Sequence, residues 1–69
     1  MNVDMNKIKD QMKEHWDMDA ATFDAHTVNR NWAHAEGWNE IEFVNAEGKP
    51  TFFIESDKDD EVWHFDWVH

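Results

Sequence analysis

The sequence contains no cysteine and no leucine, and it has only one proline and two glycines. Without cysteine, disulfide bonds, thiol chemistry and thiolate metal sites are excluded, and a cytoplasmic location is permitted. The longest unbroken apolar stretch is Phe52-Phe53-Ile54, far short of the roughly 20 residues of a membrane-spanning helix. The first residues also lack the apolar segment of a secretory signal. We therefore expect a soluble, cytoplasmic protein.

Aliphatic side chains are scarce as well, and aromatic ones replace them. Five tryptophans, five phenylalanines and four methionines supply most of the large apolar surface of the 69 residues. Each aromatic ring buries a large area, so a short chain can still build a hydrophobic core. This length has room for one core only, and we expect residues 1–69 to form one small domain.

Basic residues are the rare charged type, because six Lys and Arg oppose sixteen Asp and Glu, for a formal net charge of −10. Residues 1–16 are neutral, with three acids and three lysines, so residues 17–69 carry the whole excess. Such a charge opposes direct binding to nucleic acid or to an anionic membrane. The expected partners are basic protein surfaces.

An amphipathic helix is predicted over residues 3–17. Met5, Ile8, Met12 and Trp16 recur at steps of three or four, which is the helical period. Asp4 is placed to cap the helix, because its carboxylate can accept from free backbone N–H groups two or three residues later.

Residues 18–36 are ambiguous, and we favour a short helix followed by a strand with a turn at Glu36-Gly37. Two further strands are predicted from Trp38 and from Thr51, joined by a turn at Asn45-Ala46-Glu47-Gly48. Pro50 fits only the start of its strand or an edge position. After a polar loop at residues 56–61, residues 62–68 alternate as the last strand.

Together these elements predict an α+β fold of two layers, with the N-terminal helix packed on a three- to four-stranded antiparallel meander. The inner face of the meander is expected to hold seven apolar residues: Ile41, Phe43, Phe52, Ile54, Trp63, Phe65 and Trp67.

The outer face of the meander mixes carboxylates with apolar residues, as a surface for a basic, partly apolar partner would require. It is predicted to carry Glu40, Glu42, Glu55, His64 and Asp66 beside Trp38, Val44, Phe53 and Val68. The alternative is that residues 18–36 fold over the apolar part of this face and leave only the carboxylates in water. The predicted contact set combines this face with the following loop: Glu40, Glu42, Glu55, Asp57, Asp59, Asp60 and Asp66 as charged contacts, and Trp38 and Phe53 as apolar anchors.

Signals for metal binding and catalysis are weak. The run Asp57-Lys58-Asp59-Asp60-Glu61 resembles a calcium loop only superficially, because it lacks the required glycine and terminal glutamate. No pair of histidines has metal-ligand spacing. Pairing Glu55 with Asp66, or His64 with Asp66, as acid and base has no specific motif behind it. We predict a non-enzymatic protein without metal or cofactor.

The density of charge suggests a more specific hypothesis. A compact chain of this length spans roughly 28 Å, so ten net charges give about one per 2.8 Å, between duplex DNA (about 1.7 Å) and one strand (about 3.4 Å). We therefore predict an inhibitor or regulator that occupies the basic groove of a nucleic-acid-binding protein. In size and charge alone, the chain resembles the small DNA-mimic proteins with which phages and mobile elements counter restriction or CRISPR defences.

Two alternatives remain open at this point. The chain could be a structural or assembly protein that forms a homodimer through its exposed aromatic strand surface, with acidity serving only solubility. The acidity could also be a general adaptation to high salt.

Overall fold

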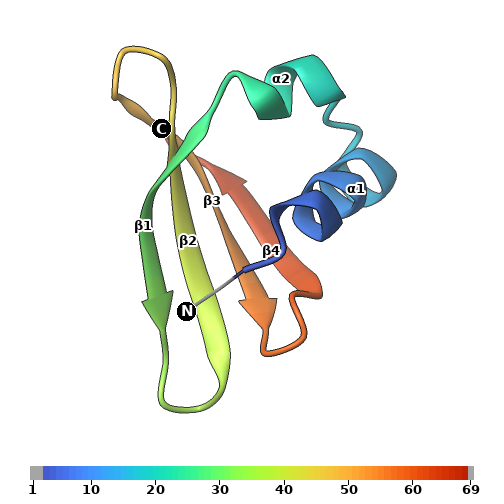
Figure 1. Ribbon diagram of the computed structural model, residues 1–69, viewed down its shortest axis with the longest axis vertical. Helices are drawn as coiled ribbons and strands as arrows, with labels where there is room; N and C mark the ends of the chain where they lie inside the picture. The colour runs from blue at the N-terminus through green and yellow to red at the C-terminus, as the bar shows by residue number, and fades with distance from the viewer. Residues whose placement is uncertain (1–2, 69) are drawn as a thin grey trace.

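The computed structural model describes residues 3–68, which form two helices and one four-stranded sheet (Figure 1). The strands follow chain order, β1-β2-β3-β4, and each pairs antiparallel with the next. Both helices lie on the same side of the sheet. The predicted two-layer α+β fold is therefore confirmed, with four strands in the meander. The elements are α1 (Met5–Trp16), α2 (Ala20–Asp24), β1 (Thr27–Ala33), β2 (Trp38–Val44), β3 (Pro50–Asp57) and β4 (Val62–Trp67).

Helix α1 begins and ends where its capping residues dictate. The Asp4 carboxylate accepts hydrogen bonds from Asn6 N and Lys7 N, both at 3.1 Å, as the sequence predicts. At the other end Asp17 adopts the left-handed conformation with φ 56°, and its N–H donates to Met12 O. The buried side of the helix presents Ile8 and Met12, both fully buried, to the sheet.

Residues 18–36 form the short helix and the strand that we favoured. Asp19 caps α2 by accepting from Thr22 N at 2.7 Å, and Phe23 lies 5.6 Å from Phe43 between ring centroids, on the inner side of the sheet. β1 then extends the sheet beside β2. The alternative in which this segment folds over the outer face is wrong, because its helix packs with α1 and its strand lies in the sheet.

The tight turns follow the predicted chemistry. Gly37 and Gly48 have φ values of 92° and 78°, in the region that favours glycine, and they close the β1–β2 and β2–β3 turns. Asn45 stabilises the second turn, because its side-chain oxygen accepts from Glu47 N and Lys49 N. β3 begins at Pro50, the strand-start position that suits a residue without an N–H, and the pairing with β2 shifts in register there.

The core lies between the helices and the inner face of β2, β3 and β4. It contains Ile8, Met12, Met18, Phe23, Ile41, Phe43, Phe52, Ile54 and Val62. Phe65 packs against this core. The Trp67 ring lies 5.6 Å from the Phe52 ring between centroids, but Trp67 is 46% exposed.

The predicted placement of Trp63 on the inner face is wrong. The register of β4 on β3 shifts between Glu55 and Ser56, so Val62 pairs with Ser56, His64 pairs with Glu55, and Trp63 is an extra residue. Val62 takes the buried position, while Trp63 is 54% exposed and contacts Trp38. Val44, expected on the outer face, is instead buried, next to a second register shift.

Neither helix among the described residues has the length and apolar character needed to cross a bilayer.

Candidate protein-binding surface

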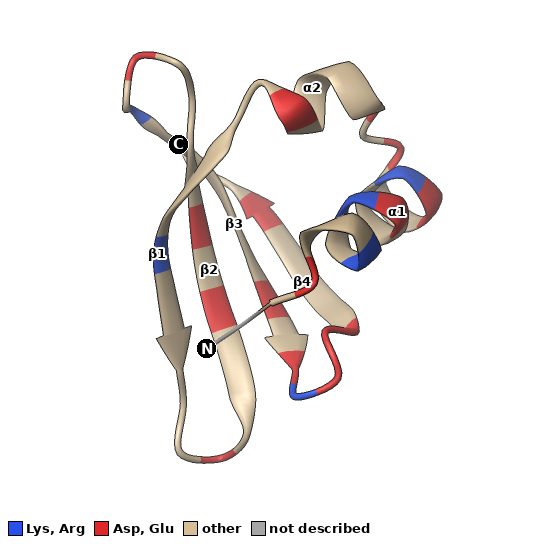
Figure 2. Ribbon diagram, in the orientation of Figure 1, with Lys and Arg blue, Asp and Glu red and all other residues tan. Residues whose placement is uncertain are grey.

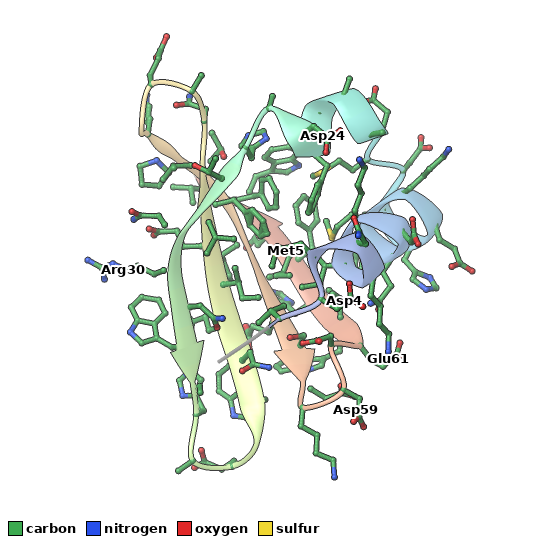
Figure 3. All side chains as sticks on the ribbon, in the orientation of Figure 1. Asp4, Met5, Asp24, Arg30, Asp59 and Glu61 are labelled. Carbon is green, nitrogen blue, oxygen red and sulfur yellow. The ribbon has the colours of Figure 1, made fainter. Side chains whose placement is uncertain are left out.

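The face of the sheet opposite the helices is the candidate site, and we call it the outer face. Strand register aligns its residues in two rows that run across all four strands. The first row is Arg30, Glu42, Phe53 and Asp66, and the second is Trp32, Glu40, Glu55 and His64. Figure 3 shows the Arg30 side chain pointing away from the helices, and Figure 2 shows acidic residues along β2 and β3.

The structure thus brings together six of the nine predicted contact residues: Trp38, Glu40, Glu42, Phe53, Glu55 and Asp66. Glu40 lies directly opposite Glu55 on the neighbouring strand. Same-face residues along one strand, such as Glu40 and Glu42, lie roughly 6.6 to 6.8 Å apart, and neighbouring strands about 4.8 Å apart. Four carboxylates therefore occupy a small, regular part of this face.

Two of these carboxylates are held by polar neighbours. Asn29 Nδ2 donates to Glu42 Oε1 at 2.7 Å. His34 Nε2 lies 3.3 Å from Glu40 Oε1, and the side chains of both residues are about one-third exposed. These contacts limit the rotation of Glu42 and Glu40, so both carboxylates are partly ordered on the outer face.

Aromatic rings border the carboxylates at one end of the sheet. Trp38 stacks on the His34 imidazole with ring centroids 3.7 Å apart, and Trp63 meets Trp38 edge-on at 5.7 Å. At β1 the Arg30 guanidinium lies 5.2 Å from the centre of the Trp32 ring, within the range of a cation–π contact. The face therefore offers flat apolar anchors beside negative charge.

The other three predicted contact residues lie at the β3–β4 turn, where Asp57 is the last residue of β3 and pairs with Trp38. Asp57 Oδ1 accepts from Asp59 N and Glu61 N, so it stabilises the β3–β4 turn. Asp60 Oδ2 accepts from Asp4 N, which ties the turn to the start of α1. The Asp59 carbonyl accepts from Lys7 Nζ at 2.8 Å. Figure 3 shows Asp4, Asp59 and Glu61 near this junction.

Lys7 completes this junction by forming an ion pair with Glu61 at 2.9 Å. Its pKa is raised, chiefly by the hydrogen bond to Glu61; desolvation opposes this rise, and the charges of Glu61, Asp59 and Asp60 add to it. The β3–β4 turn thus contacts the start of α1 through Asp4 and Lys7, and it has a structural role that the sequence did not suggest.

Sequence reasoning missed four residues of the outer face and its border: Arg30, Trp32, His34 and Trp63. The alternation of residues 28–34 pointed to a strand, but only the pairing with β2 shows that Arg30 and Trp32 lie beside Glu42 and Glu40. Trp63 reaches Trp38 because of the β4 bulge, which period-two alternation does not reveal.

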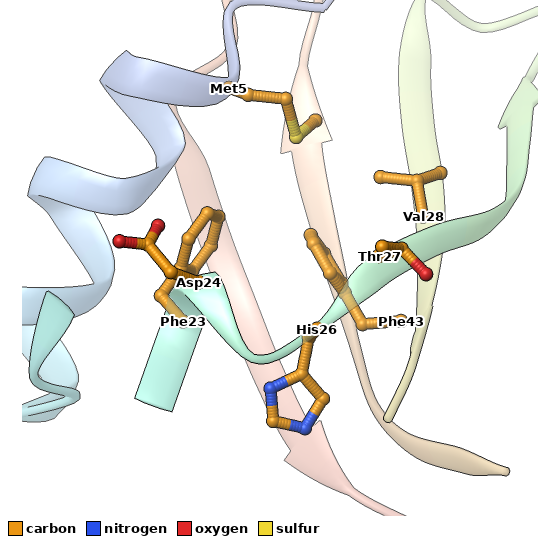
Figure 4. A pocket seen from close by; sticks show the side chains of 7 residues that line it. All are labelled: Met5, Phe23, Asp24, His26, Thr27, Val28 and Phe43. Atoms are coloured by element: carbon orange, nitrogen blue, oxygen red, sulfur yellow. The ribbon is translucent and has the colours of Figure 1, made fainter. Parts of the chain in front are cut away.

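A hollow of about 280 Å³ opens on the opposite side of the sheet, between the helices and β1 (Figure 4). Met5, Phe23, Val28 and Phe43 line its apolar part. Two polar groups at its rim already have partners, since Asp24 binds Lys9 Nζ at 2.9 Å and His26 Nδ1 lies 2.7 Å from Thr22 O. The outer face remains the stronger candidate, because its carboxylates and aromatic rings lie on the side of the sheet that the helices do not cover.

Within residues 3–68, no group of three or more His, Asp or Glu side chains is arranged to hold a metal ion. His64 and Asp66, the pair weighed above for acid–base work, lie two residues apart on β4, and their partners on β3 are Glu55 and Phe53. Comparisons with protein-family models, with curated proteins and with solved structures find no match for this chain.

Proposed function

We propose that the protein is a non-enzymatic inhibitor or regulator that binds the basic groove of a nucleic-acid-binding protein through its outer face. The observation that carries this proposal is the one-sided cover of the sheet. Both helices pack on the inner face, while the outer face carries Glu40, Glu42, Glu55 and Asp66 in neighbouring rows. Three indole rings beside them supply apolar contact area.

The dimensions support mimicry of a nucleic acid. The longest extent of the molecule is 31 Å, so its net charge of −10 corresponds to about one charge per 3.1 Å. Duplex DNA carries one negative charge per about 1.7 Å, and a single strand one per about 3.4 Å. A groove built to bind phosphates would meet a similar density of negative charge on this protein.

The distribution of the lysines adds further support. Lys7 and Lys9 are paired with Glu61 and Asp24 on the helix side of the molecule. On the outer face Arg30 is the one Lys or Arg in the two rows of described residues, and it lies at the β1 edge. The centre of the face, over β2 and β3, therefore keeps its negative charge.

The test is affinity capture from a cell lysate with a matched pair of variants. One variant neutralises the outer face by Glu40→Gln, Glu42→Gln, Glu55→Gln and Asp66→Asn. The control removes the same number of charges from exposed positions elsewhere by Asp10→Asn, Glu14→Gln, Glu36→Gln and Glu47→Gln. Both variants have the same net charge, so they separate a specific surface from a general field.

We expect the wild-type chain and the control to retain a nucleic-acid-binding protein that duplex DNA or rising salt releases, and the outer-face variant to lose it. The salt dependence follows because binding between opposite charges weakens as salt screens them. Equal retention by both variants would contradict the assignment to the outer face. Retention unaffected by salt and DNA would contradict the mimicry.

A further inference from the structure

Strand β4 is an edge of the sheet, and its backbone chemistry defines how another strand could pair with it. Val68 N donates to Thr51 O at 2.8 Å, and Phe53 and Glu55 pair with Asp66 and His64. In an antiparallel ladder the direction of the backbone groups alternates, so Phe65 and Trp67 turn their N–H and C=O groups away from the sheet. Trp67 and Val68 are each 46% exposed at this edge.

The start of the same edge is already occupied. Val62 N, which is also turned away from β3, donates to Gln11 Oε1 at 2.7 Å. Gln11 is itself held by Nε2, which donates to Asp60 O at 2.7 Å. Helix α1 thus covers the first residue of the edge, and the open ladder begins after it.

Three two-fold registers would place the outward N–H and C=O groups of Phe65 or Trp67 opposite those of Phe65 or Trp67 in a second copy. If Phe65 lies opposite its own symmetry mate, His64 of each copy faces Asp66 of the other. If Phe65 lies opposite Trp67, the two Asp66 carboxylates face each other and repel. If Trp67 lies opposite its own mate, Asp66 faces the apolar side chain of Val68 and gains no polar partner in that pair.

We propose that two copies of this chain pair antiparallel through their β4 edges, about a two-fold axis at Phe65. Each Phe65 donates its N–H to the other's carbonyl oxygen, and each His64 lies opposite the second copy's Asp66. An imidazole N–H can donate to a carboxylate in either protonation state, so this arrangement is complementary where the Asp66 to Asp66 register is repulsive.

The opposite edge of the sheet is less suited to self-pairing. β1 has a register shift between Val28 and Arg30, and bulges of this kind protect sheet edges from pairing. Its middle residues are Asn29, Arg30 and Asn31, all exposed and polar. The part of β4 after its own bulge, residues 64–68, is regular and mostly apolar.

Pairing through β4 would extend the outer face without covering it. The row from Arg30 to Asp66 would continue into His64, Glu55, Glu40 and Trp32 of the second copy. The sheet would grow from four strands, about 14 Å across, to eight strands, about 34 Å across. This inference does not rest on the proposed function, because a monomer presents the same outer face.

The oligomeric state is measured by sedimentation equilibrium from micromolar to millimolar protein, in salt of about 0.15 M, where charges are screened within about 8 Å. We expect a monomer–dimer equilibrium for the wild type, weakened by Asp66→Asn. The control Glu47→Gln removes the same charge from a turn and leaves the dimer intact. Far-UV circular dichroism checks that each variant is folded.

A wild type that stays monomeric over this range would overturn the proposal. So would a dimer strengthened by Asp66→Asn, since that result is expected only where the two Asp66 carboxylates face each other. Neither result bears on capture of a basic partner, which is measured separately.

Because the chain has no cysteine, single-cysteine variants report the register directly. Residues opposite each other in a non-hydrogen-bonded pair have Cα atoms about 4.5 Å apart, within disulfide range. We expect a mixture of His64→Cys and Asp66→Cys chains to form a disulfide-linked heterodimer on mild oxidation. Efficient cross-linking of Asp66→Cys to itself, and none in the mixture, would show that the register is wrong.

Discussion

At the scale of single residues, two polar side chains buried between α1 and the end of β3, Gln11 and Ser56, affect the stability of the fold. Gln11 satisfies Val62 N and the carbonyls of Lys7 and Asp60 at once. Ser56 is fully buried beside them, and among the described residues its hydroxyl has no hydrogen-bond partner. The two residues therefore have opposite expected effects on stability.

Ser56→Ala is expected to raise the free energy of unfolding by about 1 kcal/mol, because it removes a buried polar group that has no partner. The matched comparison is Gln11→Met, which keeps the side-chain volume but leaves Val62 N without an acceptor, and should lower the free energy by about 1–3 kcal/mol. Urea unfolding measures both. A large loss of stability in Ser56→Ala would mean that its hydroxyl makes a stabilising contact.

Asp19 makes a contribution to the stability of the folded protein that depends on pH, and its sign follows from the direction of the pKa shift. Its pKa is lowered from 3.8 because Thr22 N donates to its carboxylate. A lowered folded pKa stabilises the protein above the unfolded value, and this stabilisation is lost as pH falls through the folded value. Asp19→Ala should therefore lower the melting temperature at neutral pH, and the difference from wild type should shrink below about pH 4.

Asp19→Asn is the control, because an asparagine caps a helix without titrating. Its melting-temperature difference from Asp19→Ala should not change over the same pH range. A constant difference between wild type and Asp19→Ala down to about pH 2 would contradict the assignment of the shift to this cap.

At the scale of the elements, the pairing of β2 with β3 places two like charges opposite each other. Glu40 and Glu55 are cross-strand partners, and directly opposed like charges destabilise a sheet. A binding surface that concentrates carboxylates in this way costs stability in the unbound molecule. Under the proposed function, a basic partner would relieve this repulsion on binding.

Glu55→Gln is therefore expected to raise the free energy of unfolding by about 0.2–1 kcal/mol while weakening retention of a basic partner. Glu47→Gln, at an exposed turn, removes the same charge and should change both quantities less. Thermal unfolding and the capture assay measure the two effects. Destabilisation by Glu55→Gln would indicate that Glu55 is held by favourable contacts, such as one with His64 across the strand pair.

At the scale of the whole molecule, a net charge of −10 is carried by a chain whose radius of gyration is 11.3 Å. Screening lengths are about 30 Å at 0.01 M salt and about 8 Å at 0.15 M, so at low salt the repulsion acts across the full 31 Å of the molecule. This long-range repulsion opposes compaction.

We expect the melting temperature to rise by about 4–8 °C between these two salt concentrations, which for a domain of this size corresponds to about 1 kcal/mol. Differential scanning calorimetry in sodium chloride measures it. The outer-face variant, with four fewer charges, should show a smaller rise. Complete loss of folding at low salt would instead favour the interpretation of the acidity as adaptation to high salt.

The sequence by itself determined the features that depend on near neighbours. The apolar spacing of Met5, Ile8, Met12 and Trp16 predicted α1, Asp4 predicted its start, and Gly48 predicted the β2–β3 turn, since each depends on residues within a few positions. Alternation then predicted the strands, and with them the shared face of six of the nine predicted contact residues.

Only the tertiary structure decided which face and which partners several residues have. The bulge at Trp63 places its side chain against Trp38. The packing of α1 on the sheet brings the Asp60 carboxylate to Asp4 N and the Asp59 carbonyl to Lys7 Nζ. These outcomes depend on register and on contacts between residues as many as 56 positions apart. Local periodicity carries no information on such contacts, because a shift of one residue in register exchanges the two faces of a strand.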